Sequence, residues 1–295
     1  MIFQGIITAL ITPFKDNKID YLSLENLINK QIKSGIKSIV IGGSTGEGSS
    51  FTKEEYYDLL SSSLNFANGK INIIANLKGF DTNCDLKRVK QLSNLNLSGL
   101  MCTVTSYVRP EQTGIYQHFR ALNDANNIPM MIYINPGRTG IDLADDTLLQ
   151  LTKLENVIAV KDASNDLDKP MRLLPQIDKE FVFLTGDDSR ILAYSANGGD
   201  GCVSVLSNIF PYICRKIYQH CVGNDFHAAL KLQQQILPII GAISLESNPI
   251  GIKCAVNLMD LCKNELRLPL TSANINTKNK INDLIKKVME LEQNV

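Results

Sequence analysis

The sequence predicts an α/β fold, a (β/α)8 TIM barrel followed by a C-terminal helical appendage. Three observations support it: eight short apolar runs, amphipathic stretches between them, and no further strand pattern after residue 205. Runs that are almost continuously Val, Ile, Leu and Met are typical of parallel strands buried on both faces. Eight such units can close into a barrel, although the pattern alone also allows a doubly wound open sheet. The predicted strands are 4–11, 38–42, 71–75, 99–104, 129–134, 157–161, 181–185 and 201–205.

The first two helices have recognisable ends. An apolar stripe within 24–32 recurs at the helical period, and we expect Ser23 to cap that helix and Gly35 to end it. Thr52 with Glu55 forms the pattern of a capping box at the start of the second helix.

The C-terminal part reads as helical throughout. We expect residues 1–224 to form the barrel with the active site and residues 225–295 to form a helical domain. The apolar run 236–243 needs a partner surface, so this domain should pack on the barrel or on another subunit. The predicted helices are 209–222, 225–242, 248–261 and 278–293.

The overall composition excludes several classes of protein. The chain has 295 residues, 44% of them hydrophobic, and its 30 basic residues balance 30 acidic ones. A neutral chain is a poor binder of nucleic acid or anionic membranes, and this apolar fraction is too high for disorder. No apolar stretch is long enough to span a bilayer. Seven cysteines without a CxxC pair, and three histidines without ligand spacing, favour a reduced cytoplasmic protein without a metal site.

The active site of a barrel lies at the C-terminal ends of its strands, and Lys161 is the most informative residue there. It closes the run VIAVK and is the only lysine directly at the end of a predicted strand. Burial in an apolar barrel mouth favours a neutral amine, which attacks ketones and forms a Schiff base. The alternative is a structural lysine paired with a carboxylate such as Asp187.

Other strand ends carry groups that bind carboxylates or move protons. The loop GGSTGEG at 42–48 supplies hydroxyls and backbone N–H groups that can bind a carboxylate, although a plain strand-to-helix turn is equally consistent. Tyr107 and Tyr133 with Ser44 can form a proton relay, or they can be buried structural groups. Arg138 offers a bidentate fork for a carboxylate, unless it is an ordinary surface arginine.

Seven motifs occur in one order along the chain, and the resemblance that they carry runs from Ile6 to about Thr271. Together they resemble the dihydrodipicolinate synthase / N-acetylneuraminate lyase family of class I aldolase-like barrels. Within that family, the sequence Arg138-Thr139-Gly140 and Tyr107 resemble the synthase branch best. The motifs are GSTGE at 43–47, YVRP at 107–110, YINPGRTG at 133–140, VKDA at 160–163, TGDD at 185–188, ESNPI at 246–250 and LRLPLT at 266–271.

The resemblance implies a reaction and its catalytic residues. Lys161 would form a Schiff base with pyruvate, which then condenses with L-aspartate 4-semialdehyde on the route to lysine and diaminopimelate. Ser44, Tyr133 and Tyr107 would form the proton relay, with Tyr107 reaching across a tight-dimer interface into the neighbouring site. The family is typically a homotetramer of two such dimers.

The resemblance also implies binding residues. Thr45 would bind the pyruvate carboxylate, and Arg138 the carboxylate of the semialdehyde. Gly186 and Val203 would contribute backbone carbonyls to the pocket. No metal and no organic cofactor would be required.

Two departures from the synthase pattern define the alternatives. Ser44 stands where synthases usually have Thr, and Asp162 where they more often have Glu; both occur in sugar-acid aldolases. A class I aldolase or lyase acting on a 2-keto sugar acid, of the N-acetylneuraminate or 2-keto-3-deoxy acid type, is therefore the alternative function. A non-catalytic barrel that binds a keto acid or assembles with partners is a further alternative from another class.

A third departure concerns regulation. In lysine-sensitive members of the family, an acid stands at the position of Cys84 and an amide at that of Phe80. Without them the ammonium of lysine has no evident partner, so we expect weak or absent lysine inhibition. The residues at the aligned positions are Gly48, Lys53, Tyr56, Phe80, Cys84 and Ser106.

Overall fold

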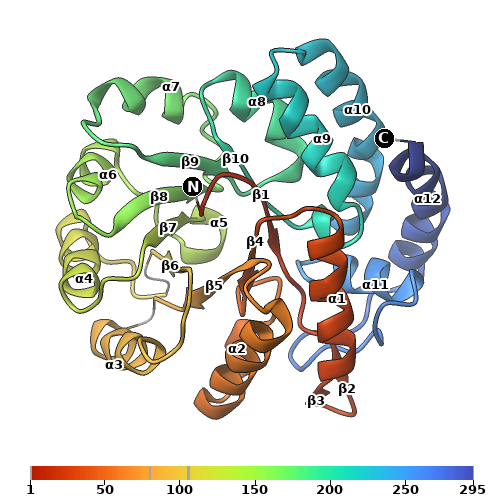
Figure 1. The fold of residues 1–295 in the computed structure, drawn as a ribbon, viewed down its shortest axis with the longest axis horizontal. Helices are drawn as coiled ribbons and strands as arrows, with labels where there is room; N and C mark the ends of the chain where they lie inside the picture. The colour runs from red at the N-terminus through yellow and green to blue at the C-terminus, as the bar shows by residue number, and fades with distance from the viewer. Residues whose placement is uncertain (1, 80, 105–106, 295) are drawn as a thin grey trace.

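The computed structural model describes residues 2–79, 81–104 and 107–294 and contains a closed barrel of eight parallel strands (Figure 1). The strands follow one another around the barrel in chain order, and β1 pairs with both β4 and β10 to close it. All eight predicted runs form these strands, and closure excludes the open sheet. The strands are β1 (Gly5–Ala9), β4 (Ser38–Ile41), β5 (Asn72–Leu77), β6 (Gly99–Thr103), β7 (Met130–Ile134), β8 (Val157–Asp162), β9 (Val182–Thr185) and β10 (Gly201–Ser204).

Each strand is buried on both faces, as its apolar run predicts. Successive side chains of a strand point to opposite faces. In β1, Ile7 and Ala9 belong to the cluster that fills the barrel interior, whereas Ile6 belongs to the layer between strands and helices. Alternate residues of a strand therefore face the barrel interior. This alternation decides which side chains at the strand ends reach the site.

The helices of the barrel surround the sheet. They are α1 (Tyr21–Lys33), α2 (Lys53–Ala67), α3 (Thr82–Leu92), α4 (Gln112–Asp124), α5 (Pro136–Thr139), α6 (Asp145–Thr152), α7 (Lys169–Leu173), α8 (Ile191–Ala196) and α9 (Pro211–Val222). Single 3-10 turns lie at Gly48–Ser50, Leu174–Gln176, Asp188–Arg190 and Leu206–Asn208.

The ends of α1 and α2 test the capping predictions. The prediction that Ser23 caps α1 is wrong, because Asp20 is the N-cap and its carboxylate accepts from both the Ser23 backbone N–H and its hydroxyl. Gly35 follows the end of α1 with a φ of +72°, which glycine adopts readily. The capping box of Thr52 and Glu55 is confirmed.

A small hairpin after β1 was not predicted. It consists of β2 (Phe14–Lys15) and β3 (Lys18–Ile19), joined by Asp16 and Asn17, which have φ values of 55° and 60°. Two-residue turns with positive φ suit the twist of a hairpin. Strands of two residues are too short to show an alternating pattern in the sequence.

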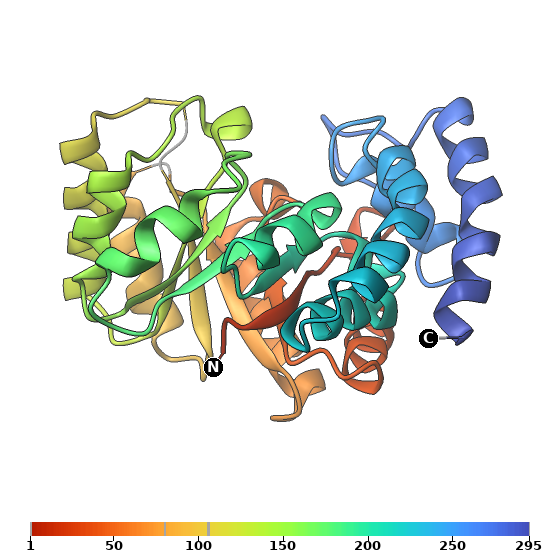
Figure 2. The same cartoon turned by 90° about the horizontal axis from the view of Figure 1, so that it is seen from above.

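The C-terminal helices pack on the barrel. They are α10 (Phe226–Ile243), α11 (Ile250–Leu258) and α12 (Ile275–Asn294), and α12 forms the outer layer against α10 and α11 (Figure 2). Ile236, Ile239 and Ile240 belong to the same buried cluster as the outer face of the barrel, so the apolar run has the partner surface it requires. The division at residues 224 and 225 stays a prediction. No described helix is long and apolar enough to cross a membrane.

Candidate active site

The register of two strands brings Lys161 and Tyr133 together. They pair across β8 and β7. Ala159 and Met131, two residues earlier, fill the barrel interior, so both strand-end side chains point inward. The Lys161 Nζ lies 4.0 Å from the centroid of the Tyr133 ring, and only 6% of the lysine is exposed. A buried amine thus lies against a phenol at the C-terminal mouth of the barrel.

Lys161 is not the only lysine at a strand end, so that prediction is wrong. β5 extends to Leu77, and Lys78 follows it directly. The polar residue Asn76 ended the apolar run in the sequence, but in the structure it still pairs with Met101 of β6. A polar side chain at the end of a strand leaves the backbone ladder intact while interrupting the pattern from which the strand was predicted.

The ion pair that would make Lys161 structural is not formed within the part of the chain that the structure describes. Asp187 pairs with Arg190 at 3.2 Å. Asp162, directly after the lysine, pairs instead with Lys169 at 3.3 Å, and both side chains are almost fully buried. Asp187 and Asp162 therefore each have another cationic partner.

The surroundings of Tyr133 favour its ionisation. Burial acts to raise the pKa of the phenol, but the charge of Lys161 opposes it. The amide of Asn135 donates to the phenolic oxygen at 2.8 Å, and Arg138 and the Ser44 hydroxyl add smaller contributions in the same direction. Together they hold the pKa of Tyr133 below its usual value, which suits a group that gives and takes protons.

The glycine-rich loop folds back on itself beside these residues. The Gly48 N–H donates to the Gly43 carbonyl at 3.0 Å, and a Cβ on Gly48 would lie 1.8 Å from the Gly42 oxygen. Only glycine fits this close approach. The tight loop places Ser44 and the buried Thr45 at the mouth of the barrel.

Asn248 connects the loop to Arg138. Its side-chain amide donates to the Thr45 Oγ1 at 2.9 Å, and its backbone carbonyl accepts from the Arg138 guanidinium at 3.0 Å. Because the Thr45 oxygen accepts this bond, its own hydroxyl proton can be donated to a ligand. The Arg138 guanidinium keeps further donors for a carboxylate.

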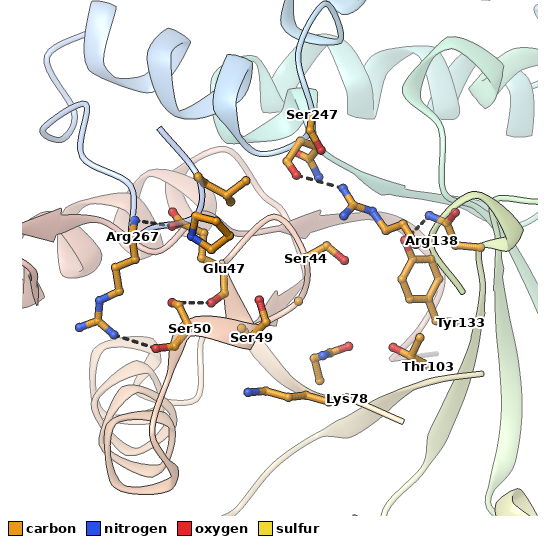
Figure 3. A pocket seen from close by; sticks show the side chains of 18 of the residues that line it. Ser44, Glu47, Ser49, Ser50, Lys78, Thr103, Tyr133, Arg138, Ser247 and Arg267 are labelled. Carbon is orange, nitrogen blue, oxygen red and sulfur yellow. Dashed lines mark hydrogen bonds between the residues drawn. The ribbon is translucent and has the colours of Figure 1, made fainter. Parts of the chain in front are cut away.

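Two adjoining cavities surround this group. The inner cavity has a volume of about 290 Å³ and is lined by Lys161, Thr45 and Gly186 among others. The outer cavity, about 360 Å³, lies toward the C-terminal segment 267–270 (Figure 3). The residues that line both are Gly43, Ser44, Tyr133, Asn135, Arg138 and Asn248.

Six of the eight predicted site residues therefore meet, and two do not. Tyr107 is 92% exposed and lines neither cavity. Val203 is fully buried in the barrel interior, whereas Val205 lines the inner cavity. Gly186 lies so close to the lysine that an added Cβ would be 3.0 Å from the Lys161 Cε.

Buried charges anchor the loop from the C-terminal side. Lys253 is fully buried, and its ammonium donates to the Glu47 carboxylate and to the Thr12 carbonyl. The other Glu47 oxygen accepts from the Arg267 backbone N–H at 3.0 Å. The Arg267 guanidinium forms a two-pronged pair with Glu55 at the start of α2. The segment 267–270 is thus fixed over the outer cavity.

Sequence reasoning missed three residues that line the cavities, Asn135, Lys78 and Asn248. Asn135 directly follows the end of β7, so the strand-end rule could have selected it. Lys78 was hidden by the short prediction for β5. Asn248 follows no strand, and only the packing of the C-terminal segment brings it to the loop.

In the described ranges no group of three or more His, Cys, Asp and Glu side chains is placed to hold a metal ion. All seven cysteines are free, and six of them are buried.

The fold and the site define an α/β-barrel enzyme. A buried lysine, a phenol with lowered pKa and an arginine at the carboxyl ends of barrel strands form a catalytic arrangement.

Comparisons with known proteins specify the family. The model of the dihydrodipicolinate synthetase family matches residues 2–288. The 4-hydroxy-tetrahydrodipicolinate synthase of Rickettsia bellii (strain RML369-C) is 44% identical over 284 residues, covering 96% of this chain and 97% of that protein. The chain belongs to the dihydrodipicolinate synthetase family.

Solved structures of the same family are similar to this chain over nearly its whole length. The crystal structure of dihydrodipicolinate synthase from Aquifex aeolicus superposes with a TM-score of 0.95 at 32% identity, covering 97% of this chain and 98% of that one. The chloride-inhibited synthase of Acinetobacter baumannii complexed with pyruvate gives a TM-score of 0.94 at 32% identity, with coverages of 98% and 99%.

Proposed function

We propose that the protein is a 4-hydroxy-tetrahydrodipicolinate synthase, a lyase of lysine and diaminopimelate biosynthesis that condenses pyruvate with L-aspartate 4-semialdehyde. The observation that carries the proposal is the buried amine of Lys161, 4.0 Å from the ring centroid of Tyr133 and free of a carboxylate partner among the described residues. Relatives of the chain bear this name over nearly its whole length.

The chemistry begins with the Lys161 amine, which adds to the ketone carbon of pyruvate and forms a carbinolamine. Tyr133 supplies the proton with which hydroxide leaves as water, giving a protonated imine. The pyruvate methyl group then gives a proton to the Tyr133 phenolate left by that step, the imine accepts the electron pair released, and an enamine results. Thr45, with its free hydroxyl proton, and the N–H groups of the glycine-rich loop hold the pyruvate carboxylate.

The enamine carbon then attacks the aldehyde, and a new carbon–carbon bond forms while the aldehyde oxygen takes a proton from Tyr133. Arg138 holds the carboxylate of the aldehyde substrate with the donors that Asn248 leaves free. The amine of that substrate adds to the imine carbon, and Lys161 leaves as the free amine. Gly186 serves as a backbone position at this pocket, and the carbonyl of Val203, whose side chain is buried in the barrel interior, stays a predicted contributor.

The experiment that tests the proposal is turnover with both substrates, coupled to a dihydrodipicolinate reductase and followed through NADPH loss. The wild-type enzyme should turn over and Lys161→Ala should not. Borohydride reduction with pyruvate should add mass at Lys161. Comparable turnover by the alanine variant would refute the role of Lys161, and a missing adduct would favour a non-catalytic barrel.

Arg138 distinguishes the synthase from the alternative aldolase on a 2-keto sugar acid. Arg138→Gln should slow the step with the aldehyde while leaving borohydride trapping of pyruvate unchanged. Loss of both steps together would contradict this assignment. Cleavage of a sugar acid, with no condensation by a well-folded enzyme, would establish the alternative.

Tyr107 completes the relay from a neighbouring subunit in this proposal, which explains its 92% exposure in one chain. The assembly is a homotetramer of tight dimers, to be checked by sedimentation. Tyr107→Phe should lower turnover in an assembled enzyme. A monomer with full activity would remove Tyr107 from the mechanism.

Regulation by lysine is weak or absent in this proposal. Tyr56 is buried and its hydroxyl donates to the Asn76 carbonyl at 2.8 Å, so its proton is already engaged within the chain. Phe80 and Ser106 lie outside the described residues. Strong inhibition by sub-millimolar lysine would contradict the expectation. The seven free thiols support a location in the cytoplasm, to be tested by fractionation.

A further inference from the structure

The outer cavity carries a cation that the proposed reaction does not use. Lys78 lines it from the end of β5 and is half-buried, and burial lowers the pKa of its ammonium. It forms no hydrogen bond or ion pair with any residue that the structure describes. The Asp85 carboxylate nearby accepts instead from the Gly79 N–H at 3.0 Å. Figure 3 shows Lys78 on the side of the cavity away from Arg138.

The other charges around this cavity are already compensated. Glu47 is its acidic lining residue, and its two oxygens accept from Lys253 and from the Arg267 backbone. The Arg267 guanidinium is paired with Glu55. Lys78 and Arg138 therefore remain as the cations without a carboxylate partner among the described lining residues, and the cavity favours an anion.

A second polar group near Lys78 lacks a partner. Asn76 lines the same cavity and is 7% exposed, and its side-chain oxygen has no hydrogen-bond partner in the described structure. A buried polar atom without a partner is costly unless a ligand or water supplies one. A half-turn of the amide group presents its NH2 to an anion, so this side chain can join the ammonium in binding.

We propose that Lys78 and Asn76 form an anion-binding subsite in the outer cavity that takes the carboxylate of a small organic acid. The subsite is separate from the carboxylate positions at Thr45 and Arg138, an assignment that rests on the proposed function. Because both cavities share Ser44, Tyr133 and Arg138, an acid held at Lys78 stands in the path of the aldehyde substrate. It competes with that substrate without displacing pyruvate from Lys161.

The test is a calorimetric titration of succinate into the wild-type enzyme in chloride-free buffer, without substrates. Lys78→Met keeps most of the length of the side chain and removes its charge. It should weaken binding by about tenfold or more, which corresponds to the loss of a charge-assisted hydrogen bond. Lys78→Arg should keep binding within about threefold because the charge stays. Lys70→Met, which removes an exposed lysine, is the matched control and should bind like the wild type.

A second measurement locates the acid. Succinate should leave the rate of pyruvate trapping by borohydride unchanged in the wild type, while it raises the KM for the aldehyde. No binding by the wild-type enzyme, equal binding by Lys78→Met, or slower trapping with succinate would each overturn the subsite. Because the titration needs no turnover, failure of the proposed reaction would be seen separately, as missing pyruvate adduct.

Discussion

Replacing Asn135 with alanine removes the donor that lies 2.8 Å from the Tyr133 phenolic oxygen. A hydrogen bond to a charged group contributes about 1.5–3 kcal/mol, and the ionised phenol is the form that this donor stabilises. Since about 1.4 kcal/mol corresponds to a factor of ten, the ionisation constant of Tyr133 should fall by about tenfold to a hundredfold. The pKa of Tyr133 therefore rises toward its usual range.

The assay is a spectrophotometric pH titration of tyrosinate. The chain has nine tyrosines and no tryptophan, so the ultraviolet band is free of indole absorbance. The difference between the wild type and Tyr133→Phe isolates the one phenol. With a smaller phenolate fraction at a given pH, turnover by Asn135→Ala should decrease near neutrality and recover as the pH rises.

Lys161→Met provides the comparison within the same titration. The lysine charge is the largest of the influences that lower the pKa of Tyr133, so its removal should raise that pKa more than Asn135→Ala does. An unchanged titration of Asn135→Ala, or the reverse order of the two variants, would refute this explanation of the phenol.

Two further substitutions test the architecture of the site. Gly186→Ala places a Cβ 3.0 Å from the Lys161 Cε, and overpacking of this kind costs about 1–3 kcal/mol, so borohydride trapping of pyruvate should slow at least severalfold; an unchanged rate would contradict the crowding. Lys253→Met leaves the Glu47 carboxylate buried without its cation and should lower the free energy of unfolding in urea by about 3–5 kcal/mol. Adding Glu47→Gln should recover much of that loss, and a double variant no more stable than Lys253→Met would argue against an ion-pair effect.

The sequence located the strands well because strands buried on both faces leave a continuous apolar run. The same criterion failed where a polar residue continues the pairing of a strand. Asn76 continues β5 although its side chain is polar. The predicted strand therefore ended too early, and Lys78 was not recognised as a residue at a strand end. The hairpin at 14–19 was missed for a different reason, because strands of two residues are too short to show an alternating pattern of polar and apolar residues.

The site was predictable to the extent that it lies at strand ends. Lys161, Tyr133, Ser44, Thr45, Arg138 and Gly186 were selected in this way or through the resemblance, and they line the inner cavity together. Tyr107 and Val203 do not line it, and their roles stay predictions. For Tyr107 the proposed role depends on a neighbouring subunit, and contacts within one chain do not test it.

The sequence by itself determined the class of fold and the types of side chain at the strand ends, because both follow from local periodicity and order along the chain. Tertiary structure alone decided which of those side chains meet. The register of β7 on β8 sets Tyr133 opposite Lys161, and a slip of one residue would turn either side chain out of the barrel. Packing of the C-terminal segment brings Asn248 to Thr45 and Lys253 to Glu47 across more than 200 positions of sequence. Contacts between such distant residues depend on the closed barrel, and no local pattern records them.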